Sequence, residues 1–184
     1  GKVTFDGKDI TGLRPDEVCK LGLARTFQVV RPFGNLSVLD NVMVGAYART
    51  SDTKKARHKA EEALAFLGMD RLANATASGL PIAGRKRLEI ARALATEPKL
   101  MLLDEAMAGL RPAEADEVIA MVRKLSEKGI AILLVEHVMK VVMSLGDRVV
   151  VLHHGEKICE GTPTEVVKDP QVIDAYLGEA NVTD

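Results

Sequence analysis

Two apolar runs that do not alternate with polar residues constrain the fold more than any other feature of this sequence. They read LMLL at 100–103 and IAILLV at 130–135. Both are far shorter than a membrane span and have the length of a β-strand. Uninterrupted strands of this kind are typical of a parallel sheet, in which both faces are covered. A helical pattern that begins at Pro112 and ends at Gly129 separates the two runs, so the sequence predicts an α/β fold.

The composition excludes several classes of protein. The 184 residues, 47% of them hydrophobic, suffice for one sizeable core with room for a small appended subdomain. The net charge of -1 and the 3% of aromatic residues provide neither a broad basic surface nor stacking platforms for nucleic acid. Cys19 and Cys159 belong to no metal-binding pattern, so we expect ordinary core thiols. Because the chain has no apolar signal core and no apolar run of membrane-spanning length, we expect a soluble, cytoplasmic protein.

The middle of the chain has a different pattern from its two ends. Residues 36–80 look wholly helical, with Ser37 as the predicted N-cap of the first helix. Short strands are predicted before this segment, one of them in LARTFQ, and further strands follow it. We therefore expect an α/β core formed by residues 1–35 and 81–184, into which a helical subdomain at 36–80 is inserted.

The C-terminal part predicts a hairpin followed by helices. The segment DRVVVLHHGEKICEG at 147–161 has the pattern of two strands that turn at His154 and Gly155. The tetrapeptide TPTE at 162–165 is a full capping box, and DPQ at 169–171 begins another helix.

Polar residues follow three of the predicted strands, at the point where each strand ends. Asp104 and Glu105 come directly after the first apolar run, His137 closes the second, and Gln28 ends LARTFQ. Each has an ordinary explanation, since acids and lone histidines are common at strand ends and a loop amide can simply be hydrogen-bonded. The carboxyl ends of parallel strands meet at one edge of a sheet, where ligands of α/β folds bind. We therefore expect these four side chains to converge on a site for a polyphosphate and its Mg²⁺.

The acidic pair has the form of a Walker B segment, in which apolar residues precede Asp-Glu. In that pattern the first carboxylate, here Asp104, holds Mg²⁺, and the second, Glu105, polarises a water toward a γ-phosphate. A neutral amide such as that of Gln28 can orient a water or contact the metal without adding charge.

Five segments resemble, in order, the ATP-binding subunits of ABC transporters. They are LARTFQ, ASGLPIAGRKRLEIARALATEPKLMLLDEAMAGLRP, ILLVEHVMKVV, DRVVVLHHGEKICEGTPTEV and VIDAYLGEA, and together they span nearly the whole chain. Within that family the chain looks most like the ATPases of branched-chain amino acid importers, which similarly read RLEIARAL before the acidic pair and end in AYLGEA. The resemblance implies a P-loop NTPase-like core sheet with an inserted helical subdomain, and it implies ATP and Mg²⁺ as cofactors.

The resemblance also implies a role for each candidate residue and a set of partners. The implied partners are a second ATPase subunit and transmembrane permease subunits, reached from the cytoplasmic face of the cell membrane, and no nucleic acid. The implied roles are Gln28 in the Q-loop facing the metal and the membrane subunit, Asp104 on Mg²⁺, Glu105 as catalytic base, His137 as the switch histidine, Ala83 and Gly84 in the nucleotide-binding signature loop, and Gly109 in the D-loop at 108–111.

Two local features depart from the family pattern. The signature loop, usually LSGGQ, reads LPIAG at 80–84, so it has no serine hydroxyl, and Pro81 has no N–H to donate. A helix predicted to begin near Gly84 carries the basic residues 85–87 in its first turn, where they either attract an anion or form a solvated face. Ala106 stands where the family commonly has proline.

A third departure is larger, because no G-x-x-x-x-G-K-[ST] motif occurs in the 184 residues. The family places this P-loop on a strand-loop-helix unit upstream of GKVTFDG, so we expect the N-terminal strand and P-loop, a unit of roughly 30 residues or more, to be missing. Without that cradle a triphosphate loses most of its binding contacts, and we expect this polypeptide alone not to hydrolyse ATP. The gap also predicts an uncovered or re-paired strand edge in the sheet.

The resemblance favours a truncated ATP-binding subunit of an importer for branched-chain amino acids or similar small solutes, whose ATP-driven dimer closure is coupled to membrane subunits. Two alternatives stay open. One is a non-catalytic ABC-like fragment that binds a partner. The other is a soluble ABC ATPase that acts on DNA or ribosomes, against which the near-neutral net charge argues.

Overall fold

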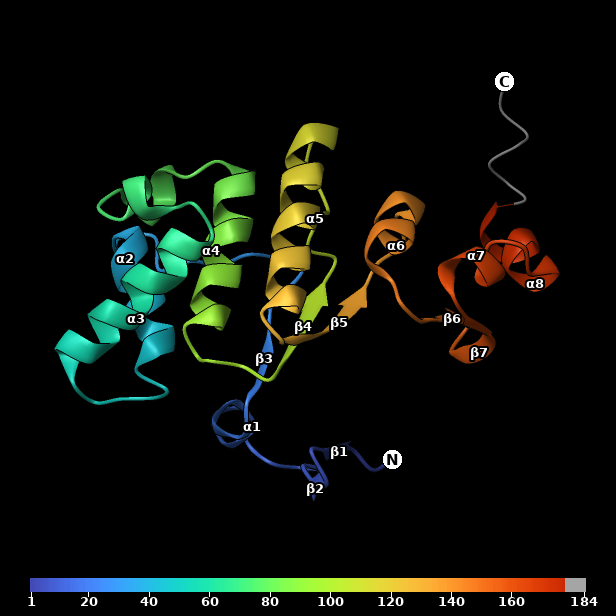
Figure 1. The fold of residues 1–184 in the computed structure, drawn as a ribbon, viewed down its shortest axis with the longest axis horizontal. Helices are drawn as coiled ribbons and strands as arrows, with labels where there is room; N and C mark the ends of the chain where they lie inside the picture. The colour runs from blue at the N-terminus through green and yellow to red at the C-terminus, as the bar shows by residue number, and fades with distance from the viewer. Residues whose placement is uncertain (178–184) are drawn as a thin grey trace. The chain divides into compact units, whose positions relative to one another are not determined.

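The computed structural model describes residues 1–177, which form two compact units. The first unit is Gly1–Val135 and the second begins at Glu136. Each unit is described by itself below, with the helices and strands labelled as in Figure 1.

A parallel three-stranded sheet organises the first unit (Figure 1). Its strands, in the order in which they pair, are β3 (Leu23–Arg25), β4 (Leu100–Asp104) and β5 (Ala131–Val135). The central strand β4 pairs in parallel with both neighbours, and its side chains Met101 and Leu103 are buried. The α/β fold with a parallel sheet, which the apolar runs predicted, is confirmed.

Strand β5 differs from the prediction, because it is not covered on both faces. Alternate side chains along it are exposed, and Leu133 and Val135 each keep 55% of their surface in solvent. Helix α5 (Pro112–Glu127) contacts the strand, but within residues 1–177 its only ladder partner is β4. The prediction of burial on both faces was therefore wrong here, since an edge strand has cover only where a neighbour reaches it. Of the two outcomes expected for this sheet, an uncovered or a re-paired edge, the described residues have the uncovered one at β5.

A group of helices lies between β3 and β4 in the sequence. The elements are α2 (Val38–Ala46), α3 (Thr53–Phe66), the short 3-10 turns η1 (Asp70–Leu72) and η2 (Ala77–Gly79), and α4 (Ile82–Leu94). Helix α2 packs against both α3 and α4 (Figure 1). Ser37 caps α2 as predicted, since its Oγ accepts the Asp40 N–H at 3.0 Å. The sequence from 36 to 80 is thus occupied by helical elements and their connections.

Gly45 permits the close approach of α2 and α4. A Cβ atom at this position would overlap the backbone carbonyl oxygen of Arg92 on α4. Val38, Val42 and Ala46, on the same helix as Gly45, have no exposed surface at all. The two helices therefore pack with backbone against backbone at this point, and only glycine fits there.

Arg49, just after α2, joins two chain segments that are distant in sequence. The chain before the sheet forms β1 (Thr4–Phe5), β2 (Lys8–Asp9) and α1 (Pro15–Leu21). The Arg49 guanidinium donates to the carbonyl oxygens of Cys19 and Lys20 at the end of α1, and to those of Thr96 and Glu97 after α4. Backbone hydrogen bonding is incomplete at and beyond helix ends, and one guanidinium here donates to four such carbonyl oxygens.

Helix α5 and the two cysteines complete the comparison with the expected core. Val118, Val122 and Leu125 are buried on one face of α5, as their spacing predicted. The cysteines are only half-buried, so their prediction as core thiols was wrong. Cys19 lies on α1, which has no buried residue, and Cys159 lies on β7 of the two-stranded ladder in the second unit.

The second unit contains the hairpin and the helices predicted for it. The elements are α6 (Met139–Leu145), β6 (Val149–His153), β7 (Glu156–Gly161), α7 (Pro163–Val166), α8 (Pro170–Val172) and the π-helical turn η3 (Ile173–Leu177). The hairpin turns at His154 and Gly155, which both have left-handed backbones. The capping box is present, since the Thr162 N–H donates to Glu165 Oε2 at 2.8 Å.

Two findings concern the limits of the described chain and its helices. The end of the segment VIDAYLGEA, residues 178–180, lies outside the described residues. Among the helices from residue 1 to 177, none has both the length and the apolar character needed to cross a membrane.

Candidate functional site

Two carboxylates stand at the end of β4. Asp104 is the last residue of the strand and pairs with Val135 of β5. Glu105 follows with a left-handed backbone, φ 44°, and donates its N–H to the carbonyl oxygen of Val135 at 3.0 Å. Such a conformation is uncommon for a residue other than glycine and persists only where neighbouring groups hold it. The carbonyl oxygen of Val135 is one of those groups.

Gln28 reaches this carboxylate pair from the neighbouring strand. Its Nε2 donates to Glu105 Oε2 at 2.6 Å. Strand β3 is shorter than LARTFQ predicted and ends at Arg25, although the Thr26 N–H still donates to the Leu102 carbonyl oxygen of β4 at 2.9 Å. Gln28 therefore lies in the loop after the strand rather than at its last position. The structure brings Gln28, Asp104 and Glu105 together, as the strand ends predicted.

Arg25 belongs to the same site, although the sequence did not single it out. Its Nη2 pairs with Asp104 Oδ2 at 3.0 Å, and its guanidinium lies 5.0 Å from the centre of the Phe27 ring. Both side chains of the ion pair are partly exposed, so the pairing is only a modest contribution to stability. The sequence did contain a signal for this role, because Arg25 lies at the end of the strand predicted beside the strand that ends in Asp104.

Two charged residues of α4 support the loop that carries Gln28, and the sequence missed their role. Lys86 is 6% exposed, and its Nζ donates to the carbonyl oxygens of Gln28 at 3.1 Å and Glu105 at 3.0 Å. Glu89 is 5% exposed, and its Oε1 accepts the Phe27 N–H at 3.1 Å. Burial raises the pKa of the Glu89 carboxyl above its ordinary value, while the Phe27 N–H and the nearby Arg92 act in the opposite direction.

The prediction for the basic run at 85–87 therefore needs a correction. Lys86 neither attracts an outside anion nor lies on a solvated face, because two backbone carbonyls take its hydrogen bonds inside the protein. Arg85 turns back and donates to the carbonyl oxygens of Leu80 and Ser78, both at 2.8 Å. Helix α4 also begins at Ile82, earlier than predicted. The available signal was the spacing of Lys86 and Glu89, which lie on the same helical face as the buried Ile90.

The other predicted site residues lie on separate elements. Ala83 and Gly84 are in the first turn of α4, where helix geometry leaves N–H groups without carbonyl partners inside the helix. Gly109 lies between β4 and α5 with a left-handed backbone, φ 76°. His137 follows β5 in the second unit, just before α6, and its convergence with the other three residues stays a prediction.

A cavity of about 660 Å³ opens beside Asp104. Arg25, Gln28 and Asp104 line it together with the apolar side chains of Phe27, Val29 and Phe33. Those three apolar side chains are exposed, Val29 to 65%. The cavity therefore joins a charged end to an apolar wall, as a surface that binds a partner or a ligand commonly does.

The donor set suits a hydrated Mg²⁺, which prefers oxygen ligands and usually binds through one or two carboxylates with water or phosphate oxygens. Asp104, Glu105 and the amide of Gln28 supply oxygen ligands of this kind: Gln28 contacts Glu105, and Asp104 lines the same cavity as Gln28. Within residues 1–177 no group of three or more histidine, cysteine, aspartate or glutamate residues is placed to hold a metal. The residues thus fit a cation that keeps most of its ligands from water or from a bound phosphate.

Comparisons with known proteins identify the class. The family described as ABC transporter matches residues 1–108, and the family described as Branched-chain amino acid ATP-binding cassette transporter matches residues 156–181. The chain belongs to the ABC transporter family, as one of its ATP-binding domains. The family predicted from the sequence is therefore confirmed.

Individual relatives are similar over nearly the whole chain. The high-affinity branched-chain amino acid transport ATP-binding protein BraF of Pseudomonas aeruginosa is 36% identical over 98% of this chain and 77% of its own length. The protein LivG of Salmonella typhimurium, described in the same words, is 38% identical with the same coverage.

Solved structures agree with the fold. A nucleotide-free ATP-binding cassette from an ABC transporter matches with a TM-score of 0.84 and 32% identity, over 96% of this chain and 76% of that one. An ATP-binding cassette of an ABC transporter in its ADP conformation has the same TM-score and identity, over 97% and 77%. The P-loop NTPase-like fold implied by the resemblance is confirmed.

Proposed function

We propose that this chain is part of the ATP-binding subunit of an importer for branched-chain amino acids or similar small solutes, with Mg²⁺ and ATP as cofactors. The observation that carries the proposal is the contact between Gln28 and Glu105 beside Asp104, where β3 and β4 lead out of the sheet. The names of BraF and LivG, which are 36% and 38% identical, support the choice of solute.

The proposed roles follow from the chemistry of each side chain. Asp104 holds the metal, and Glu105 accepts a proton from an attacking water as general base. Gln28 orients that water or contacts the metal through its amide, and its hydrogen bond to Glu105 fixes the direction of the carboxylate. His137 is the proposed switch histidine. When bound, Mg²⁺ neutralises charge on the phosphate oxygens.

The glycine-rich part of the site is proposed to act between two subunits. Ala83 and Gly84 at the start of α4, with Gly109 after β4, would face nucleotide held by a second ATPase subunit. The P-loop motif is absent from the 184 residues, so the proposal requires a complete subunit to supply it, and the relatives are longer than this chain. Closure of two such subunits on ATP would drive the transport step.

The apolar wall of the cavity is the proposed contact with the transmembrane permease subunit. Phe27, Val29 and Phe33 are exposed beside Arg25 and Arg31. An apolar patch rimmed by charge is typical of a protein interface. The subdomain at 36–80, which begins next to Phe33, would move with that contact, and the subunit would work at the cytoplasmic face of the membrane.

The test uses a complete subunit reconstituted with its permease. Glu105→Gln keeps the size of the side chain and the contact with Gln28 but removes the general base, so ATP hydrolysis and leucine uptake should fall by about 10²–10⁴-fold. Glu127→Gln, at the exposed end of α5, is the matched control and should change neither. Unchanged hydrolysis in Glu105→Gln would refute the catalytic role. A pull-down with this chain tests the partner-binding alternative. Recovery of soluble proteins without the permease would favour that alternative.

A further inference from the structure

Helix α4 holds the loop after β3 at two neighbouring residues, Phe27 and Gln28. Glu89 accepts the Phe27 N–H, and Lys86 donates to the Gln28 carbonyl oxygen. The two helical residues are three positions apart, so they lie on the same face of α4. The backbone on either side of the Gln28 side chain is thus fixed by one helix.

The Lys86 ammonium also contacts Glu105, the residue whose carboxylate accepts from the Gln28 amide. Lys86 Nζ donates to the Glu105 carbonyl oxygen at 3.0 Å, while the Glu105 N–H donates to Val135. Both backbone groups of Glu105 therefore have partners, since its carbonyl oxygen accepts the Ala108 N–H as well as Lys86, and these contacts hold its left-handed φ of 44°. A single buried cation spans Gln28 and Glu105, which are far apart in sequence.

The alternative is that Lys86 is only a packing residue, and its chemistry argues against this. A buried ammonium is costly unless its N–H groups are hydrogen-bonded, and a methionine would fill similar space without that cost. The carbonyl oxygens within 3.1 Å of Nζ belong to the two residues whose side chains meet at 2.6 Å. The position of the charge is thus matched to the site rather than to the core.

We infer that Lys86 is a positioning residue of the proposed site and that, with Glu89, it sets the distance between the Gln28 amide and the Glu105 carboxylate. The catalytic purpose of this role rests on the proposed function, whereas the contacts made by Lys86 and Glu89 do not depend on it. Because Ala83 and Gly84 lie at the start of the same helix, a shift at that end of α4 would reach Gln28 and Glu105 directly through Lys86. A nucleotide bound at Ala83 and Gly84 would in this way change the position of the Glu105 carboxylate.

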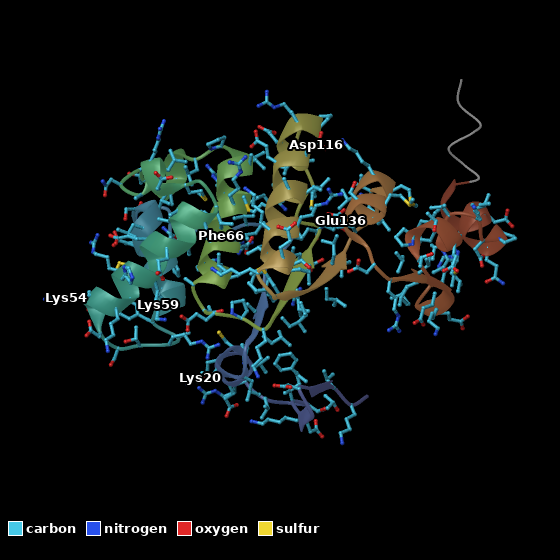
Figure 2. All side chains as sticks on the ribbon, in the orientation of Figure 1. Lys20, Lys54, Lys59, Phe66, Asp116 and Glu136 are labelled. Carbon is cyan, nitrogen blue, oxygen red and sulfur yellow. The ribbon has the colours of Figure 1, made fainter. Side chains whose placement is uncertain are left out.

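The first experiment measures the Gln28 side-chain amide by NMR in the 184-residue chain. Lys86→Met should shift the Gln28 Nε2 resonances and speed their hydrogen exchange by about tenfold, the equivalent of one lost hydrogen bond. The control is Lys54→Met on α3, an exposed lysine labelled in Figure 2, which should leave both unchanged. Equal exchange in the wild type and Lys86→Met would overturn the inference.

The second experiment separates positioning from general support of the fold. Mn²⁺, used as a paramagnetic substitute for Mg²⁺, is titrated into the wild type, Lys86→Met, Gln28→Ala and the double variant. If Lys86 acts through Gln28, its replacement should weaken Mn²⁺ binding several-fold in the wild type and have no further effect beside Gln28→Ala. Additive losses would contradict the positioning role. Failure of the wild type to bind Mn²⁺ would count against the proposed metal site and leave the amide result to decide on Lys86.

A further measurement covers the case in which Lys86→Met does not fold. Glu89→Gln keeps an acceptor for the Phe27 N–H, while Glu89→Leu removes it. The Phe27 amide should therefore stay protected from exchange in the first variant and lose at least about tenfold of its protection in the second. If the Phe27 amide of the wild type exchanges as fast as a loop amide without a hydrogen bond, the proposed hold of α4 on this loop through Glu89 is refuted.

Discussion

Replacement of Asn41 by alanine should lower the free energy of unfolding by about 2–4 kcal/mol. Asn41 lies in α2 with no exposed surface. Its Oδ1 accepts the Phe33 N–H at 2.9 Å, and its Nδ2 donates to the carbonyl oxygens of Phe33 at 3.1 Å and Ser37 at 2.9 Å. One amide therefore fastens the loop that carries Phe33 to the helix that follows.

The magnitude follows from what each group retains after the change. The Phe33 carbonyl oxygen still accepts the Leu36 N–H at 3.0 Å, and the Ser37 carbonyl oxygen still accepts the backbone N–H of residue 41 at 3.0 Å. Only the Phe33 N–H loses the acceptor described here, and an unsatisfied donor costs about 1–3 kcal/mol. The two weakened carbonyl contacts contribute the remaining ~1 kcal/mol.

Urea unfolding followed by circular dichroism measures this loss. The control is Asn35→Ala, an exposed asparagine in the same loop, which should change stability by no more than about 0.5 kcal/mol. Asn41→Asp keeps the acceptor but turns a second oxygen toward the carbonyls, so it should also be destabilising. A loss below about 1 kcal/mol in Asn41→Ala would show that these hydrogen bonds are not what holds the loop.

Three further outcomes are expected. Gly45→Ala should cost more than about 3 kcal/mol in urea unfolding, because the new Cβ overlaps the Arg92 carbonyl oxygen, while Gly79→Ala, where a Cβ meets open space, should be nearly neutral. Burial raises the folded-state pKa of Glu89 above the ordinary 4.5. The free energy of unfolding of the wild type relative to Glu89→Gln should therefore be highest below pH 4.5 and decline as the pH rises through the folded-state pKa. A stability difference between the two proteins that stays constant between about pH 4 and pH 8 would contradict this. Arg49→Lys should cost about 1–3 kcal/mol, because an ammonium cannot reproduce the guanidinium fork over carbonyls of two segments, and loss below that range in thermal unfolding would argue against it.

Features with a local cause were predictable from the sequence. The cap at Ser37, the turn at His154 and Gly155, and the buried face of α5 each depend on residues a few positions apart. The approach of Gln28 to Glu105 was also predictable, because parallel strands end at one edge of a sheet.

Features that depend on distant partners were not predictable in the same way. The sequence shows Lys86 as one member of a basic run, and its burial follows only from carbonyls of residues 28 and 105. Glu89 likewise depends on the Phe27 N–H, which lies on another element. The exposure of Leu133 has the same origin, since an apolar pattern indicates a strand but not whether a neighbour covers it.

The pairing order of the sheet has a consequence for how the chain folds. Leu100 meets Ala131 across α5 alone, whereas Leu23 meets Leu100 across the whole helical segment. A loop more than twice as long costs at least about 0.6 kcal/mol more to close, and pairing between distant segments is the slower step in folding. We expect the β4-α5-β5 unit to form early and β3 to dock late, so that Gln28 joins the two carboxylates in one of the final steps of folding.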